Sequence, residues 1–202
     1  MSGDSRGRGR PPLDLLRGIR IFRNALPPGL VRSLRGELKR RPRDPTGSRW
    51  HPFARSPTSA IEEAIQTLRP KTGSGRRCVG AEWWARRGPS DRGYHLHVDY
   101  DVSLKLVRGR YSFPILSSIL YLGDRGGATV FCDQVFVPSR GGGSLRPRSP
   151  TRAAYVRPRR NTFVTFSPRL RHGVLPAPRS AGERFSFLVN WWHRKPRGPH
   201  CV

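Results

Sequence analysis

Two histidines and an aspartate are the residues of this chain with the clearest capacity for chemistry. His97 and Asp99 are separated by one residue, and His172 follows much later. On a β-strand, residues two positions apart point to the same face, so His97 and Asp99 would present an imidazole and a carboxylate side by side. With His172 supplied by a strand of the facing sheet, the three would form a 2-His-1-carboxylate triad, which binds Fe(II) and leaves positions open for a 2-oxo acid and O2. The alternative is a local His97–Asp99 hydrogen bond and an unrelated histidine.

Three further residues fit the cosubstrate that such an iron needs. Arg184 follows His172 by twelve residues, and Ser186 shares its face of a predicted strand. An inward guanidinium needs a carboxylate partner, and the C5 carboxylate of 2-oxoglutarate would bind it through two parallel hydrogen bonds. Ser186 would add a hydroxyl donor. Tyr121, on another strand whose inward residues face the same pocket, would add a second one. The alternatives are an arginine on an exposed edge strand and a core tyrosine with its hydroxyl at the rim.

Two neighbours of the His97–Asp99 pair compete with it for the role of ligand. His95 lies on the same strand face but four residues from Asp99, so we assign it to the wall of the site, with an exchange for His97 left open. Asp101 continues that face, and we expect it in an outer layer of the site or on the substrate side.

The charge of the chain is extreme, at +26, and 35 of its 39 basic residues are arginine. Such a chain attracts nucleic acids and acidic peptides. A GC-rich coding sequence, which also favours the 22 glycines and 20 prolines, explains the same composition. The arginines are scattered along the chain instead of forming one stripe, so a nucleic-acid partner is not favoured.

The length of 202 residues suits one compact domain, which we place at residues 13–195 between a disordered basic arm (1–12) and a tail (196–202). No apolar run is long enough to span a membrane, and the N-terminus does not resemble a secretory signal. Three cysteines without a framework spacing suit a reducing compartment. We therefore expect an intracellular, cytoplasmic protein, with an organelle-targeting segment left open.

The periodicity predicts helices first and strands afterwards. We expect a strand at 19–23, a helix from Leu30 to Arg40, a loop at 41–57, and a second helix that begins at Thr58 or Ser59 and is stopped by Pro70. A long loop is expected at 138–151. Short β-prone runs follow residue 78, at 79–86, 94–100, 113–122, 128–136, 153–157, 162–166, 170–175 and 184–192. The pattern indicates a mainly β (α+β) fold of the jelly-roll type.

Three groups of segments carry recognisable motifs: 84–88 with 94–99, 118–124 with 126–131, and 156–158 with 161–166 and 172–174. In the same order, they resemble the motifs of the prolyl-4-hydroxylase-like branch of the 2-oxoglutarate/Fe(II)-dependent oxygenase superfamily. The resemblance extends over residues 15–192. Asn161 stands where that family has a glycine, and asparagine tolerates a positive φ.

The resemblance implies a double-stranded β-helix, iron held by His97, Asp99 and His172, and 2-oxoglutarate bound at Arg184, where collagen-type members have lysine. It implies a dioxygenase that uses Fe(II), 2-oxoglutarate and O2, with ascorbate as a further candidate cofactor. The expected reaction is hydroxylation of an unactivated C–H bond of a peptide, a protein side chain or a small molecule. The alternatives are a nucleic-acid demethylase of the same fold and a non-enzymatic basic binding module. The sequence leaves the oligomeric state open.

Overall fold

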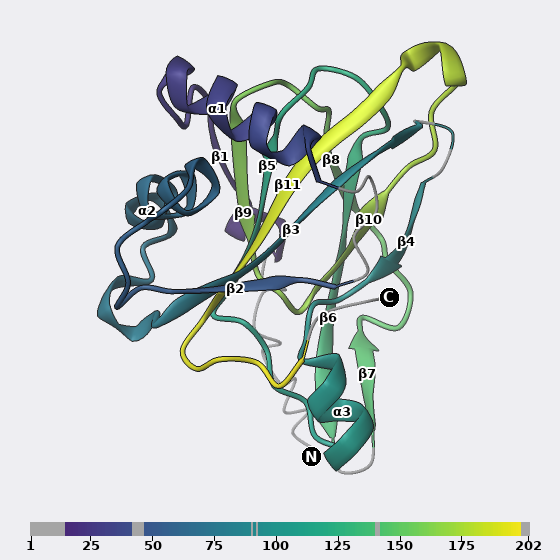
Figure 1. Cartoon of the computed structure of the whole chain (residues 1–202). Helices are drawn as coiled ribbons and strands as arrows, with labels where there is room; N and C mark the ends of the chain where they lie inside the picture. Colours follow the sequence, from purple (N-terminus) through teal and green to yellow (C-terminus); the bar gives the residue numbers. More distant parts are fainter. Residues whose placement is uncertain (1–14, 42–46, 90, 92, 140–141, 199–202) are drawn as a thin grey trace, which may run out of the picture.

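The computed structural model describes residues 15–41, 47–89, 91, 93–139 and 142–198. Within these ranges the strands form two antiparallel sheets that face each other (Figure 1). The larger sheet contains, in spatial order, β1 (Arg20–Phe22), β9 (Thr162–Phe166), β5 (Leu116–Tyr121), β11 (Glu183–Trp192), β3 (Gly80–Pro89) and β2 (Arg49–Pro52). The smaller sheet contains β4 (Tyr94–His97), β10 (Leu170–Val174) and β6 (Thr129–Ser139), with β8 (Ala153–Val156) and β7 (Gly142–Arg146) on the far edge of β6. The predicted double-stranded β-helix, mainly β with helices near the N-terminus, is confirmed.

The inner core lies between the two sheets. Phe131 and Leu170 of the smaller sheet pack against Ile119, Val164 and Phe166 of the larger one. All of these side chains are at most 4% exposed. This core fills one part of the sandwich, so the polar residues of the site occupy the remaining interior.

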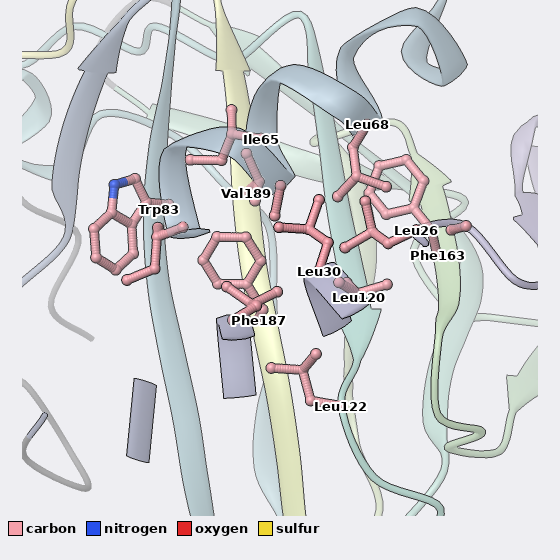
Figure 2. Close-up of a cluster of buried hydrophobic side chains, with 14 of the residues drawn as sticks. Leu26, Leu30, Ile65, Leu68, Trp83, Leu120, Leu122, Phe163, Phe187 and Val189 are labelled. Carbon is pink, nitrogen blue, oxygen red and sulfur yellow. The ribbon is translucent and has the colours of Figure 1, made fainter. Parts of the chain in front are cut away.

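The outer core lies between the larger sheet and two helices, α1 (Pro28–Lys39) and α2 (Ala60–Thr72). Figure 2 shows Leu30 of α1 and Ile65 of α2 reaching towards Phe187 and Val189 of β11. Because side chains alternate along a strand, the odd-numbered residues of β11 face this core and the even-numbered ones face the interior of the sandwich. Burial of the outer core therefore fixes which way the functional residues of β11 point.

Helix α2 begins at the predicted cap but does not end where we expected. The Ser59 hydroxyl accepts a hydrogen bond from the Glu62 backbone N–H at 3.2 Å. The prediction that Pro70 stops the helix is wrong, because α2 continues to Thr72 and ends at Gly73, whose φ is 66°. Proline removes only its own backbone donor, so the helix continues past it. In the last turn the buried Thr72 side chain donates to the Arg69 carbonyl at 2.7 Å, which gives a partner to one of the carbonyls left open at the helix end.

Tertiary contacts create regular structure in segments that the sequence assigned to loops. Strand β2 lies inside the predicted loop 41–57 and pairs with β3. The predicted long loop at 138–151 is wrong for its first half, because β6 extends to Ser139 and β7 pairs with it. Strand β4 ends at His97, and a helix that was not predicted, α3 (Val102–Arg108), follows it. In β2 and β7, pairing with the edge of an existing strand outweighs the low β propensity of the sequence.

Short 3-10 helices occupy Leu15–Gly18, Gly75–Arg77 and Arg179–Ala181. The predicted basic arm (1–12) and the last four residues of the predicted tail lie outside the described residues. Across the described part of the chain, none of the helices has the length and apolar character needed to cross a bilayer.

Asn161 ties the segment before α1 to the larger sheet. Its side chain accepts a hydrogen bond from Leu26 N–H at 2.9 Å and donates one to the Leu26 carbonyl at 2.8 Å. Its own carbonyl accepts from Ala25 N–H, and its N–H donates to the Tyr121 carbonyl. The residue adopts φ 61°, so asparagine satisfies the positive φ for which the family motif has glycine and adds a clamp that glycine lacks.

We predict that Asn161→Gly lowers the free energy of unfolding by about 1–3 kcal/mol, since both side-chain hydrogen bonds are lost while the positive φ stays accessible. Asn24 provides the matched control: it also has a positive φ (49°) but is exposed. Asn24→Gly should change stability by less than about 0.5 kcal/mol. Urea denaturation measures both, and equal effects of the two variants would rule out the clamp.

Candidate metal centre and cosubstrate pocket

Strands β4 and β10 are neighbours in the smaller sheet, and their register places His97 directly opposite His172. The two imidazole centroids are 4.4 Å apart. Asp99 follows β4, and its backbone N–H donates to the Pro168 carbonyl at 2.8 Å. The Asp99 carboxylate oxygens lie 3.7 Å from His97 Nε2 and 3.6 Å from His172 Nε2. The sequence therefore named three residues that the fold brings together, with candidate ligand atoms all within 4.8 Å of one another.

The prediction of the sheet that supplies His172 is wrong. We expected it on the facing sheet, but it lies on the strand next to His97 in the same sheet. Cross-strand neighbours have their Cβ atoms about 4.5–5.5 Å apart, which suits two imidazoles that converge on one point.

Both imidazoles are oriented by the backbone in the same way. His97 Nδ1 lies 2.7 Å from the His95 carbonyl oxygen, and His172 Nδ1 lies 2.8 Å from the Leu170 carbonyl oxygen. A carbonyl can only accept, so in the neutral rings each Nδ1 carries the proton and each Nε2 keeps a lone pair. The two Nε2 atoms are those that face Asp99. Each histidine is thus held in the tautomer that a metal ligand requires.

His172 is deeply buried, whereas His97 forms an open side of the site. The side chain of His172 is 6% exposed and packs between Phe131 and Phe166. Burial lowers the pKa of His172 to about 4, against the opposing effect of Asp99. The His97 side chain is 43% exposed. Near neutral pH, His172 is therefore neutral and able to donate its lone pair.

Arg184 is buried on the inner face of β11, 6% exposed. Its guanidinium donates to the Gly127 carbonyl and, at 2.9 Å, to the Thr129 hydroxyl. These acceptors are neutral, and no carboxylate among the described residues forms an ion pair with Arg184. Burial lowers its pKa. A buried cation held only by neutral acceptors favours the arrival of an anion.

Tyr121 lies beneath Arg184 and is fully buried. The guanidinium carbon sits 5.1 Å from the centre of the Tyr121 ring. The Tyr121 hydroxyl is 2.6 Å from the Thr129 hydroxyl and 3.3 Å from the Val156 carbonyl oxygen. Burial raises the pKa of Tyr121. Its hydroxyl is thus engaged inside the protein, and its ring and its bond to Thr129 both support Arg184.

Ser186 also points into the interior, and one pocket joins it to the triad. Its hydroxyl is buried without a hydrogen-bond partner among the described residues. An unpaired buried hydroxyl next to a guanidinium is available to a bound ligand. The residues that line this pocket include the three triad residues, Arg184, Ser186, Thr129, Trp84, Leu188 and Asn190.

Neither neighbour of the His97–Asp99 pair takes part in the cluster of ligand atoms. His95 is exposed and contributes its backbone carbonyl to His97. Asp101 is 3% exposed and caps α3 by accepting from Leu104 N–H at 2.8 Å. Its other oxygen accepts from Arg197 N–H at 2.8 Å. The expectation of an outer-layer or substrate-side role for Asp101 is replaced by a structural one, because both oxygens serve backbone donors.

The sequence analysis did not single out Thr129, which contacts both Arg184 and Tyr121. A signal for it exists in the glycine pair just before β6. Gly126 adopts φ 102°, and a Cβ atom placed on it would lie 2.5 Å from the Arg184 Cβ. The chain can therefore approach Arg184 closely only because position 126 is glycine, and Thr129 follows three residues later.

Comparisons with known proteins agree with this geometry. The sequence model of the 2OG-Fe(II) oxygenase superfamily matches residues 83–193. A prolyl 4-hydroxylase from Pseudomonas putida is 24% identical with a TM-score of 0.56, over 88% of this chain and 89% of that one. HygX from Streptomyces hygroscopicus, solved with nickel and 2-oxoglutarate, is 17% identical with a TM-score of 0.53, over 87% and 83%. A collagen prolyl hydroxylase of Paramecium bursaria Chlorella virus-1 is 15% identical with a TM-score of 0.54, over 95% and 96%. These likenesses are of fold. None of the curated protein sequences matches this chain.

The chain belongs to the 2OG-Fe(II) oxygenase superfamily. It is a 2-oxoglutarate-dependent dioxygenase, and its cofactors are Fe(II), 2-oxoglutarate and O2. The non-enzymatic alternative is thereby set aside. The donor set of two imidazoles and a carboxylate suits Fe(II), and the buried Arg184 with the unpaired Ser186 hydroxyl suits a dicarboxylate.

The depressed pKa of His172 predicts how the metal-free protein responds to acid. Its value in the unfolded chain is near 6.5 and its folded value is about 4. The unfolded state therefore binds a proton first, and stability falls as the pH drops from about 6.5 to 4, by about 3 kcal/mol for this group. Below pH 4 the loss from His172 stops.

Urea denaturation across this pH range, with wild type and His172→Gln compared, measures the effect. Between pH 6.5 and 4, the free energy of unfolding of the variant should fall by about 3 kcal/mol less than that of the wild type. Parallel pH profiles for the two proteins would contradict the assignment of the buried neutral state to His172.

Proposed function

We propose that this enzyme hydroxylates an unactivated C–H bond, with His97, Asp99 and His172 as the iron ligands and Arg184 with Ser186 as the binding site for the far carboxylate of 2-oxoglutarate. The observation that supports this best is the convergence of the three ligand atoms in a pocket that also exposes Arg184 and Ser186. Other functions compatible with a jelly roll do not require both features in one pocket.

The protein's part in metal binding follows from orientation and burial. The backbone carbonyls of His95 and Leu170 hold the two rings so that both Nε2 atoms face one point. The Asp99 carboxylate completes the set and offsets the positive charge of a divalent cation. Because His172 is neutral at physiological pH, no proton has to leave it before the metal binds.

Arg184 fixes the orientation of the cosubstrate. Its guanidinium is held by Gly127 and Thr129 and supported by the Tyr121 ring, so a carboxylate meets a fork that is already in place. Ser186 lies two residues further along β11 and offers an unpaired hydroxyl to the same carboxylate. Tyr121 acts on the cosubstrate through Arg184 and Thr129.

The remainder of the pocket is available to the molecule that is oxidised. Arg184 and Asn190 are six residues apart on one strand, about 20 Å at roughly 3.3 Å per residue. A five-carbon diacid spans only about 6 Å from end to end at about 1.5 Å per carbon–carbon bond. Trp84, Leu188 and Asn190 line the pocket beyond Ser186. We assign this part to a peptide, a protein side chain or a small molecule with an apolar surface against Trp84.

Bound Fe(II) with 2-oxoglutarate and O2 supplies the oxidising chemistry, in which the cosubstrate is decarboxylated to succinate. The chain contributes the rest. It fixes the ligand geometry, anchors the cosubstrate at Arg184, and excludes water with Phe131, Phe166 and Leu188.

We predict that His172→Ala and Asp99→Ala each lower Fe(II) affinity by more than about 100-fold, since even residues that only support a metal ligand change affinity 10–100-fold. Anaerobic Fe(II) titration and release of succinate from 2-oxoglutarate measure the loss. His95→Ala is the matched control, because it removes an exposed imidazole and keeps the carbonyl that orients His97. Retained affinity in His172→Ala, or equal loss in His95→Ala, would refute the proposed ligand set.

We predict that Arg184→Gln raises the KM for 2-oxoglutarate by about 30-fold or more, as expected when one partner of a buried charge pair is removed at a cost of about 2–5 kcal/mol. Fe(II) affinity should stay within a few-fold of wild type. Arg179→Gln, five residues earlier and highly exposed, is the control and should leave the KM unchanged. An unchanged KM in Arg184→Gln would overturn the cosubstrate assignment while leaving the iron site untouched.

A further inference from the structure

The fold gathers arginines that are far apart in the sequence into one hollow. Arg23 follows β1, Arg125 lies in the β5–β6 loop, and three more come from the β8–β9 loop. All five residues are exposed to solvent. The hollow is lined by Arg23, Arg125, Arg157, Arg159 and Arg160, among other residues.

Two smaller hollows continue this surface along α1. They share Asp124 and Arg160 with the first hollow, so the three hollows adjoin one another. They add three cations from α1, namely Arg32, Arg35 and Lys39. We call the eight basic residues of the three hollows the arginine groove.

The groove has few negative charges to balance it. Among its described lining residues the acids are Asp124 and Glu183. Asp124 Oδ1 accepts from the Arg160 backbone N–H at 2.7 Å, and Glu183 lies 3.9 Å from Arg87, outside the groove. Within the described part of the chain, none of the eight cations forms an ion pair with a carboxylate. Like charges held together in this way repel one another, and a bound polyanion relieves the repulsion.

The groove is also held in shape before any ligand binds. The Arg160–Asp124 bond joins the β8–β9 loop to the β5–β6 loop. Asn161 ties the same loop to Leu26, close to Arg23. Because the backbone of these loops is already fixed, binding orders only the side chains, and less conformational entropy is lost than if the loops also had to be ordered.

We propose that the arginine groove binds an extended chain of phosphates. Guanidinium forks match phosphate oxygens, and a phosphate chain has the closely spaced charges that eight neighbouring cations require. The main hollow has no aromatic side chain among its described lining residues, so bases would find no stacking platform. The groove therefore recognises charge and not base identity, whether the phosphates belong to polyphosphate or to a nucleic-acid backbone. This proposal does not depend on the iron site.

The test uses the full-length protein and measures the salt dependence of binding to a fluorescent thymidine oligonucleotide by anisotropy. Arg125→Gln, Arg159→Gln and Arg160→Gln combined should reduce the slope of log K against log salt by about 2, because a single strand contributes about 0.7 per phosphate contact. The matched control removes the same charge from the other basic hollow, at Arg108, Arg110 and Arg197. It should leave the slope within about 0.5 of wild type. Thermal melting checks that both triple variants are folded, and the single variant Arg159→Glu provides a second measurement.

Inorganic polyphosphate and polyglutamate of equal charge serve as competitors. Polyphosphate should displace the oligonucleotide at lower concentration than polyglutamate does, and the tighter of the two phosphate ligands identifies the source. Equal losses in the two triple variants would mean attraction to overall charge and would overturn the proposal. Competition by polyglutamate that equals that of polyphosphate would overturn the assignment to phosphate.

Discussion

The register between β4 and β10 is the constraint on which the candidate metal centre depends. It sets His97 opposite His172, and the same two backbones supply the carbonyls that hold both Nδ1 protons. A shift of one residue would turn one imidazole to the other face of the sheet. Gly173 secures this pairing, because a Cβ atom there would lie 2.7 Å from the Tyr94 carbonyl oxygen of the neighbouring strand.

In strand β11, side chains that alternate between the two faces link the stability of the fold to the candidate site. Its odd-numbered residues, such as Phe187 and Val189, are held in the outer core under α1 and α2 (Figure 2). Because side chains alternate along the strand, Arg184 and Ser186 then point inward. The burial of apolar side chains on the opposite face of the same strand thus offsets the free-energy cost of burying a guanidinium. The helices near the N-terminus thus help to shape the candidate pocket although they do not line it.

Much of the fold was predictable from local patterns. The β-prone runs after residue 78, except for the end of the run at 94–100, were confirmed, as were the burial face of α1 and the Ser59 cap, because periodicity and capping are local properties. The segments that failed, β2, β7 and the last turn of α2, owe their structure to partners elsewhere in the chain. In the site, the clustering of His97, Asp99 and His172 was predictable from their types and order, whereas Thr129 was not, since only its contact with Arg184 distinguishes it from other buried threonines.

The sequence by itself determined the superfamily, the fold class and the residue types that fit an iron and a dicarboxylate, because these depend on side-chain chemistry and on spacings within single strands. Tertiary structure decided which strand faces which. It placed His172 beside His97 in one sheet, gave Asp101 to the cap of α3, and collected Arg23, Arg125 and Arg160 from distant segments into one groove. Long-range strand pairing sets these positions, and no local pattern records it.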